Sequence, residues 1–228
     1  MKRFYKSVTV GGDLSVQLDG QPILTPATAK LAPPTRALAQ AVAEEWAGQG
    51  DTVEPASMPL TKLANTAIDR ASALRTDIVA ELLGFAQSDL LCYYAIEPDE
   101  LIVRQRHHWT PLLDWAHATH GARLKTVHGV THIQQDAQAI AALQRVLQVQ
   151  DDWTLTGLQT LTTITGSLVL ALAVAAERLS PADAFVLSRI DETFQAEKWG
   201  ADAAAEQRAT RLCHEVEMAG RFIALARP

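Results

Sequence analysis

The most apolar stretch of the 228-residue sequence is LTTITGSLVLALAVAA, at Leu161–Ala176. No charged residue occurs between Asp152 and Glu177. A helix that is apolar on every side is normally buried on every side. We therefore expect this stretch to form a central buried helix against which the other segments pack. Its uninterrupted apolar part spans only residues 168–176, whereas a bilayer requires about 20 residues, so membrane insertion is not expected.

The N-terminal segment shows a different period. In residues 4–24 apolar and polar positions alternate, which is typical of strands. Gly11-Gly12-Asp13 and Asp19-Gly20 are turn signals, and the second favours a type I′ hairpin. We expect residues 1–32 to form a small antiparallel β-meander and residues 33–228 to form a helical domain. The predicted fold class is α+β, with the small meander packed on a larger multi-helical body.

Most of the remaining chain has apolar residues at helical spacing. The expected helices cover residues 35–48, 60–71, 76–85, 110–120, 137–147 and 180–199, and a final helix capped by Asp202. Two of these starts, Thr110-Pro111 and Ser180-Pro181, depend on proline, which is well placed at the first position of a helix. The run DLLCYYAI fits a strand or a helix, and the segment 124–133 is extended in character.

Composition excludes several classes of protein. Apolar residues make up 48% and charged residues 20% of the sequence, as in a globular protein. The net charge of −6 and the scattered lysines and arginines argue against a nucleic-acid partner. Cys92 and Cys213 are far apart in the chain, so neither a disulfide framework nor a zinc knuckle is expected. The N-terminus lacks the apolar segment of a signal peptide, and a reducing cytosol fits best.

Histidines offer one route to an enzyme. Six of the seven lie within 26 residues: His107, His108, His117, His120, His128 and His132. His128 and His132 would have metal-ligand spacing on a helix, but Gly129 and the alternation around it favour an extended segment. HExxH is absent, and no Asp or Glu has a matching offset. A metal-dependent hydrolase that uses the His107–His132 cluster is the alternative function, and ordinary histidines without a metal are favoured.

Other catalytic patterns are missing. The sequence contains neither GxGxxG nor GxxxxGK[ST], so it lacks the usual phosphate-binding loops and no nucleotide cofactor is expected. Ser167 is not in a GxSxG elbow. Cys92 lies in an apolar, aromatic run, where a small buried hydrophobe is favoured over a reactive thiolate. We therefore predict no catalytic residue, no cofactor and no enzymatic activity.

The segment 180–199 carries a more informative pattern. On a helical wheel its apolar face consists of Val186, Leu187, Ile190 and Phe194. A second stripe on the far side consists of Ser188, Glu192, Gln195 and Trp199. Tryptophan is unusual on a solvated face and enriched in interface hot spots, so this stripe is a candidate recognition surface. From spacing alone, however, the favoured interpretation is that Trp199 folds back onto the last helix and Glu192 faces water. For Trp46, which ends a regular apolar stripe, a role in the core is favoured.

Five segments, in this order, share a pattern with one protein family. They are MPLTKLANTAID (58–69), GFAQSDLLCYY (84–94), WTPLLDWA (109–116), TGSLVLALA (165–173) and SRIDETFQAEKWG (188–200). Together they resemble the ATP synthase assembly chaperones that bind the alpha subunit of the F1 sector, which occur in mitochondria and alphaproteobacteria. The resemblance runs from the N-terminal meander to about residue 210.

The resemblance implies a non-enzymatic chaperone that binds the unassembled F1 alpha subunit and prevents its aggregation before the beta subunit pairs with it. Without a nucleotide motif, this binding is expected to be independent of ATP. The resemblance places an important acid at Asp191 or Glu192, followed by Trp199-Gly200, and implies a structural or partner-binding role for Trp46. Tyr94 stands where a basic residue is expected. The absent presequence favours a bacterial, cytoplasmic protein, whereas eukaryotic relatives are in the mitochondrial matrix.

Overall fold

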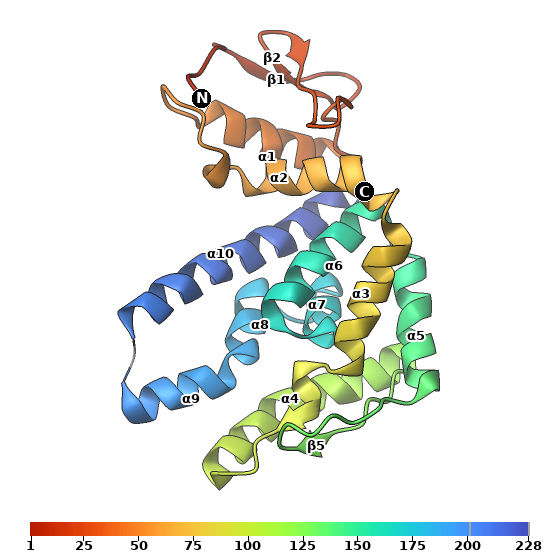
Figure 1. Cartoon of the computed structure of the whole chain (residues 1–228). Helices are drawn as coiled ribbons and strands as arrows, with labels where there is room; N and C mark the ends of the chain where they lie inside the picture. The colour runs from red at the N-terminus through yellow and green to blue at the C-terminus, as the bar shows by residue number, and fades with distance from the viewer. Residues whose placement is uncertain (201, 228) are drawn as a thin grey trace. The chain divides into compact units, whose positions relative to one another are not determined.

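The structure of the protein is a computed structural model that describes residues 1–200 and 202–227 (Figure 1). The chain forms two compact units. The first consists of Met1–Arg75, Asp151–Gly157 and Met218–Pro228, and the second consists of Thr76–Gln150 and Leu158–Glu217. These units are defined by contacts within the folded chain. The predicted division into a β region (residues 1–32) and a helical domain (residues 33–228) concerns the kind of secondary structure and stays a prediction.

The predicted α+β fold is confirmed, and its β part lies in the first unit. The strands are β1 (Val8–Val10), β2 (Val16–Leu18) and β3 (Gln21–Pro22), paired antiparallel in that order. Asp19 and Gly20, between β2 and β3, both have positive φ, 48° and 81°. Two successive left-handed residues are the requirement of the type I′ turn that the Asp-Gly pair predicts.

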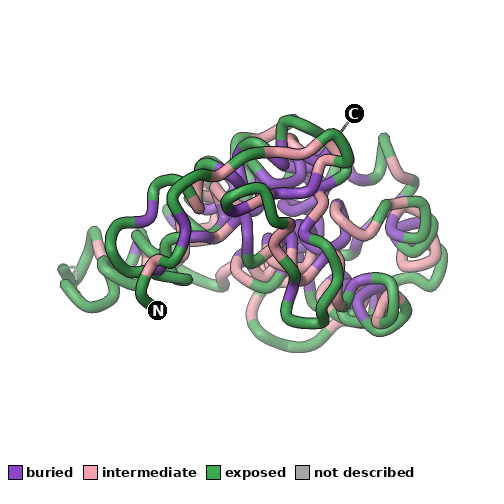
Figure 2. Tube along the Cα trace, turned by 90° about the horizontal axis from the view of Figure 1, so that it is seen from above, coloured by how far each residue is buried: buried purple, intermediate pink, exposed green. Residues whose placement is uncertain are grey.

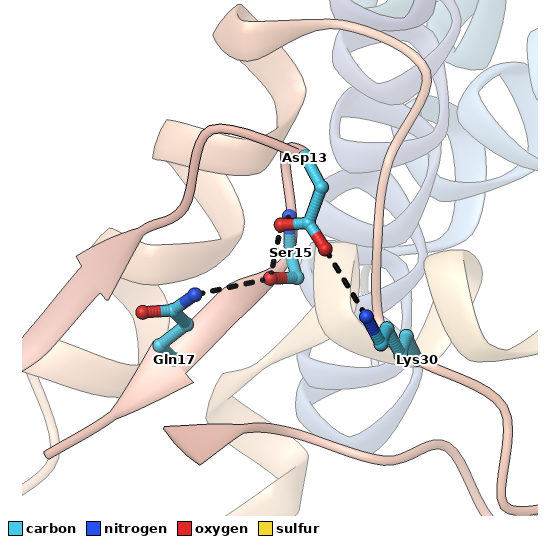
Figure 3. A network of polar contacts seen from close by, with 4 residues as sticks. All are labelled: Asp13, Ser15, Gln17 and Lys30. Carbon is cyan, nitrogen blue, oxygen red and sulfur yellow. Dashed lines mark hydrogen bonds and ion pairs between the residues drawn. The ribbon is translucent and has the colours of Figure 1, made fainter. Parts of the chain in front are cut away.

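Short polar side chains stabilise the turn between β1 and β2 (Figure 3). The Asp13 carboxylate accepts hydrogen bonds from the hydroxyl and the backbone N–H of Ser15, at 2.6 and 3.2 Å. Lys30 Nζ lies 3.3 Å from the other carboxylate oxygen, and Gln17 Nε2 donates to the Ser15 hydroxyl at 3.3 Å. The hydrogen bonds from Ser15 lower the pKa of Asp13 to about 2.

The first unit also contains helical elements, which follow the sheet in the chain. They are α1 (Arg36–Ala47), the 3₁₀ turn η1 (Pro55–Ser57), α2 (Pro59–Thr66) and the π-helical turn η2 (Ala67–Ala71). The sheet contacts α1, which the Thr35 hydroxyl caps at the N-terminus. The Glu45 carboxylate accepts the Leu60 and Thr61 backbone N–H groups at 2.7 and 2.8 Å, so α1 caps the start of α2.

The second unit is mainly helical. Its elements are α3 (Arg75–Gln87), the 3₁₀ turn η3 (Leu90–Cys92), β4 (Tyr93–Tyr94), α4 (Asp99–His120), β5 (Val127–His128), α5 (Ala137–Gln148), α7 (Leu168–Ala175), α8 (Pro181–Ser188) and α9 (Ile190–Trp199). Two further helices, α6 (Asp152–Thr165) and α10 (Ala203–Ala226), have residues in both units. β4 and β5 pair in parallel, on either side of α4 in the sequence. None of the described helices is both long and apolar enough to cross a membrane.

The central apolar run is buried as predicted, but it is not one helix. All eight residues of α7 are buried, and α7 contacts α4 and α8. Figure 2 shows such buried stretches in purple between exposed ones in green. Gly166, with φ of 71°, ends α6, and the Ser167 hydroxyl accepts the Leu170 N–H at 3.0 Å to start α7. A left-handed glycine followed by a capping serine separates two helices, so the prediction of a single helix is wrong.

The predicted start of a helix at Thr110 is also wrong. α4 begins at Asp99 and continues through Pro111 to His120, where Gly121 (φ 73°) ends it as expected. Proline inside a helix removes one backbone hydrogen bond and costs about 3 kcal/mol. A continuous buried stripe on both sides of Pro111 offsets this cost: Leu101, Gln105, Trp109, Leu112, Leu113 and Ala116.

The predicted helix over residues 180–199 is broken in the middle. α8 starts as predicted, with the Ser180 hydroxyl accepting the Asp183 N–H at 3.0 Å. At Arg189 the backbone leaves the helical region (φ −118°, ψ 24°), and α9 begins at the next residue. The apolar face changes with the break, since Val186 is 60% exposed while Ile190 and Phe194 are buried. The Asp202 carboxylate accepts the N–H groups of the first turn of α10, as predicted.

Candidate functional site

The candidate recognition surface lies on α9. Glu192, Gln195 and Trp199 are all exposed, and the Trp199 side chain is 79% exposed. At spacings of three and four residues they lie on one side of the helix. We call these three residues the α9 face. The Trp199 indole lies in water and does not fold back onto the last helix, which is the arrangement that spacing alone favours, and its role in partner binding stays a prediction.

Ion pairs fix α9 to α4, which lies beside it in Figure 1. The Arg104 guanidinium binds both carboxylate oxygens of Glu197, each at 2.9 Å, and Lys198 Nζ lies 2.9 Å from Glu100. The buried Phe194 ring lies between these pairs. The Arg104 guanidinium and Lys198 Nζ are 5.4 and 5.2 Å from the centroid of this ring. The hydrogen bond from Arg104 lowers the pKa of Glu197. The α9 face is thereby presented on an anchored helix.

Asp191 belongs to a half-buried network and not to the α9 face. Its carboxylate accepts a hydrogen bond from Gln105 Nε2 at 2.6 Å, and the Gln105 carbonyl oxygen accepts the Ala95 N–H at 2.8 Å. Gln105 is fully buried. Burial raises the pKa of Asp191, and the neighbouring Glu192 charge raises it further, while the bond from Gln105 opposes both. Asp191 therefore links α9 to α4 and to the chain after β4.

Ser188 is separated from the other members of its predicted stripe. It is the last residue of α8, and its hydroxyl donates to the Phe185 carbonyl oxygen at 2.7 Å. After the break, the Arg189 guanidinium lies 3.4 Å from the Glu192 carboxylate. The prediction that the four residues form a single stripe is wrong, because the helix is not continuous. A partner-binding role for Ser188 stays a prediction.

Trp46 lies in the first unit, where it packs against the core. Its ring is 5.8 Å from that of Tyr5, centroid to centroid, and its carbonyl oxygen accepts the Tyr5 hydroxyl at 2.8 Å. Two cavities, of approximately 480 and 340 Å³, are both lined by Trp46. The indole Nε1 is buried and has no hydrogen-bond partner within the described chain. Packing thus accounts for the ring, but not for the N–H group.

The histidines do not form a metal centre. Among residues 1–200 and 202–227, no group of three or more His, Cys, Asp or Glu side chains could hold a metal ion. His128 is in β5, so the helical spacing to His132 does not apply. His107 stacks edge-on against His108, with 4.9 Å between ring centroids, and His120 lies against Trp115. The metal-dependent hydrolase is therefore not favoured.

Gln105 was not among the site residues predicted from the sequence. A signal was present, because Gln105 is a polar residue four positions after Leu101 and four before Trp109, within an apolar stripe. Placing the start of the helix at Thr110 hid this stripe. Buried polar side chains in such stripes are normally hydrogen-bonded, and here the partner is Asp191.

Comparison with known proteins agrees with the sequence motifs. A sequence model of the ATP12 chaperone protein matches residues 2–117. The crystal structure of Atp12 from Paracoccus denitrificans is 39% identical, with a TM-score of 0.94 over 99% of this chain and 98% of that chain. A point mutant of the same protein gives a TM-score of 0.93 at 39% identity, with the same coverage. An Agrobacterium tumefaciens protein is 40% identical, with a TM-score of 0.92 over 97% of this chain and 84% of that chain. The chain described above therefore belongs to the ATP12 chaperone family.

Proposed function

We propose that this protein is an assembly chaperone that binds the unassembled alpha subunit of the ATP synthase F1 sector. It would hold the alpha subunit until the beta subunit covers the same surface. The observation that carries the proposal is the exposed indole of Trp199, flanked by Glu192 and Gln195 on an anchored helix. Membership of a chaperone family supports the class of function, and the alpha subunit as client is our inference from the sequence motifs.

The α9 face has the chemistry of a protein-binding surface. Aromatic anchors with polar neighbours are typical of interface hot spots, and Trp is among the most enriched residues there. An unassembled subunit exposes a large apolar patch, which is an aggregation hazard. Trp199 would cover part of such a patch, while Glu192 and Gln195 would satisfy polar groups at its edge.

We further propose that the protein acts without ATP and is not an enzyme. The sequence lacks the usual phosphate-binding motifs, which supports a passive binding role. The relatives from Paracoccus and Agrobacterium are bacterial, which supports a cytoplasmic location. The energy for release would then come from the competing beta subunit, since both would cover the same surface of the client.

The proposal is tested by refolding isolated alpha subunit in the presence of the purified protein. We expect light scattering to fall as the protein approaches equimolar amounts, and a complex of the two to co-elute in size-exclusion chromatography. Added ATP should change neither result. Unchanged scattering together with the absence of a co-eluting complex would refute the proposed function.

Charge reversal on the α9 face tests the site itself. Glu192→Lys should weaken alpha-subunit binding at least tenfold, because a polar contact at the edge of the α9 face is replaced by a repulsive or unpaired charge. The melting temperature should change by less than about 2 °C, since the pair with Arg189 is exposed. Glu215→Lys, an exposed charge reversal on α10, is the matched control and should bind like the unaltered protein. A large loss of stability in Glu192→Lys would make Glu192 structural.

A further inference from the structure

A second concave site lies on a different face of α4 from the one that contacts α9. Its cavity has a volume of approximately 310 Å³. Its lining on α4 recurs at helical spacing, at Arg106, Thr110, Leu113, Asp114 and His117. The rest of the lining comes from β4, β5 and the chain before β5: Tyr94, Arg123, Leu124, Thr126 and His128. We call this cavity the α4 pocket. All of its residues belong to the second unit.

The lining of the α4 pocket combines buried side chains with a rim of exposed polar ones. The buried members of its lining are Tyr94, Leu113 and Leu124, while the charged and imidazole side chains are exposed. Sites that bind small groups commonly combine apolar walls with a few polar groups that fix orientation. The buried leucines would contact a short apolar stem, and the guanidinium groups at the rim would contact the polar group at its end.

His128 holds Arg106 in place at the rim. His128 Nδ1 lies 2.8 Å from the Ala95 carbonyl oxygen, which can only accept, so Nδ1 carries the proton. His128 Nε2 lies 3.2 Å from Arg106 Nη2, which can only donate, so Nε2 is the acceptor. In this arrangement His128 accepts a hydrogen bond from Arg106 and positions the guanidinium. Since a guanidinium has five N–H donors, several remain available to a ligand.

The charge at the rim is opposite in sign to that of the whole chain. The lining contains two guanidinium groups, Arg106 and Arg123, and one carboxylate, Asp114, in a protein of net charge −6. Neither Arg123 nor Asp114 has an ion-pair partner in the part of the chain that the structure describes. The nearby Lys125 is different, because its Nζ lies 2.7 Å from Asp136 and it does not line the pocket. The excess positive charge selects an anion.

We propose that the α4 pocket binds a carboxylate carried on an apolar stem, presented by the client protein. The group is a glutamate side chain, whose carboxylate ends an aliphatic stem, or the C-terminal residue of the client, whose carboxylate lies beside an apolar side chain. Arginine binds carboxylates with two parallel hydrogen bonds, which the rim guanidiniums can provide. That the ligand comes from a client protein rests on the proposed function. Recognition of the carboxylate itself does not.

Short peptides added to the full chain test this proposal. The probes are Ac-Gly-Leu-Glu-Leu-Gly-NH₂, its Gln counterpart, and Ac-Gly-Leu-Gly-Leu with a free C-terminal carboxylate. Binding is followed by NMR of the ¹⁵N-labelled arginine side chains and backbone. One of the two carboxylate peptides should bind saturably and shift the resonances of Arg106 and Arg123. The Gln peptide should bind at least tenfold more weakly. The better carboxylate peptide identifies the source of the group, and sodium acetate should bind more weakly because it has no stem.

Matched variants distinguish specific binding of the peptide in the α4 pocket from general electrostatic attraction of the peptide to positive charge. Arg106→Gln and Arg123→Gln should each weaken binding of the better peptide at least tenfold. Lys125→Gln removes the same charge beside the pocket and should change the affinity less than twofold. His128→Phe should weaken binding by a smaller factor, because it removes a positioning contact and no contact with the ligand. An equal effect of Lys125→Gln and Arg106→Gln would overturn the pocket, as would binding of the Gln peptide as tight as that of the better carboxylate peptide.

The outcome is separable from that of the proposed function. If the unaltered protein suppresses alpha-subunit scattering but no carboxylate peptide saturates the pocket at millimolar concentration, the pocket proposal fails and the chaperone proposal stands. If a carboxylate peptide binds as described but the alpha subunit is not held, the chaperone proposal fails and carboxylate recognition stands. Weaker alpha-subunit binding by Arg106→Gln, at an unchanged melting temperature, would support both.

Discussion

Asp191 and Glu192 are adjacent in the chain but lie in different surroundings. Asp191 is half-buried and hydrogen-bonded to Gln105, whereas Glu192 is exposed, with the Arg189 guanidinium 3.4 Å from its carboxylate. The sequence motif could not assign the important acid to one of them. Their surroundings suggest two roles. A change at Asp191 would act through the attachment of α9, and a change at Glu192 would act at the partner surface.

Trp46 allows a test of a single buried polar atom. Its indole N–H has no partner among the described residues, and an unsatisfied buried donor costs about 1–3 kcal/mol. Trp46→Phe removes this N–H and keeps a ring against Tyr5, so the free energy of unfolding should change by less than about 1 kcal/mol. Trp46→Ala removes the ring as well and should cost at least about 2 kcal/mol.

Urea denaturation of the three proteins measures these differences. Equal destabilisation by Trp46→Phe and Trp46→Ala would show that the N–H group is bonded in solution. It would also show that the ring alone does not explain the role of this residue. The comparison further decides whether Trp46 is needed for stability or for a partner, because a stable Trp46→Phe protein can be assayed for alpha-subunit binding.

At the scale of elements, the sequence predicted helix ends well where a capping residue marks them. Thr35, Ser180 and Gly121 mark ends at the expected places. It failed where an internal signal could be read in two ways. Thr110-Pro111 resembles a helix start, but packing carries α4 through the proline. The Gly166-Ser167 break was hidden because a strongly apolar run surrounds it.

Pro111 should make α4 less stable than its length suggests. Proline donates no N–H to the helix, and its ring crowds the carbonyl group four residues earlier. Pro111 is exposed, so its replacement disturbs no buried contact. Pro111→Ala should raise the free energy of unfolding by about 1 kcal/mol, less than the full proline cost because the unfolded chain gains freedom.

Thermal unfolding followed by circular dichroism should therefore show a melting temperature about 2–4 °C higher for Pro111→Ala. Pro181→Ala is the control, since Pro181 is at the first position of α8, where no intrahelical N–H bond is lost. It should leave the melting temperature unchanged or slightly lower. A lower melting temperature for Pro111→Ala would mean that α4 depends on the local geometry that the proline imposes.

At the scale of the whole molecule, contacts between distant segments were beyond the reach of the sequence. β4 and β5 pair in parallel across α4, and each is only two residues long, too short for a period to appear. Gln105 and Asp191 are 86 positions apart. Local chemistry predicted the meander and most helices, but it did not predict the exposure of Trp199. The α4 pocket depends on three separate segments, and no local pattern predicts such an assembly.

Asp89 is the clearest of these long-range contacts. It is fully buried, and its carboxylate accepts the Ser167 hydroxyl at 2.7 Å and the Val169 and Leu91 N–H groups at 3.1 Å. It thereby caps α7 from a segment 78 residues earlier in the chain. Burial raises the pKa of Asp89 to about 6, even though each of these hydrogen bonds lowers it. Ionisation of this one group therefore couples to unfolding.

The sign of the coupling follows from proton binding. Between its ordinary value of 3.8 and about 6, Asp89 binds more protons in the folded protein than in the unfolded chain. Its contribution to stability is therefore fully present below about pH 4 and is lost as the pH rises through 6.

The variant Asp89→Asn tests this coupling, because an asparagine side chain does not titrate. The difference in free energy of unfolding between the unaltered protein and this variant should fall from pH 5 to pH 7 and then level off. Asp13→Asn is the control, because the pKa of Asp13 is about 2 and this carboxylate stays ionised throughout. Urea denaturation at intervals of half a pH unit measures both differences, and a flat profile for Asp89→Asn would mean that the carboxylate is ionised throughout this range in the folded protein as well.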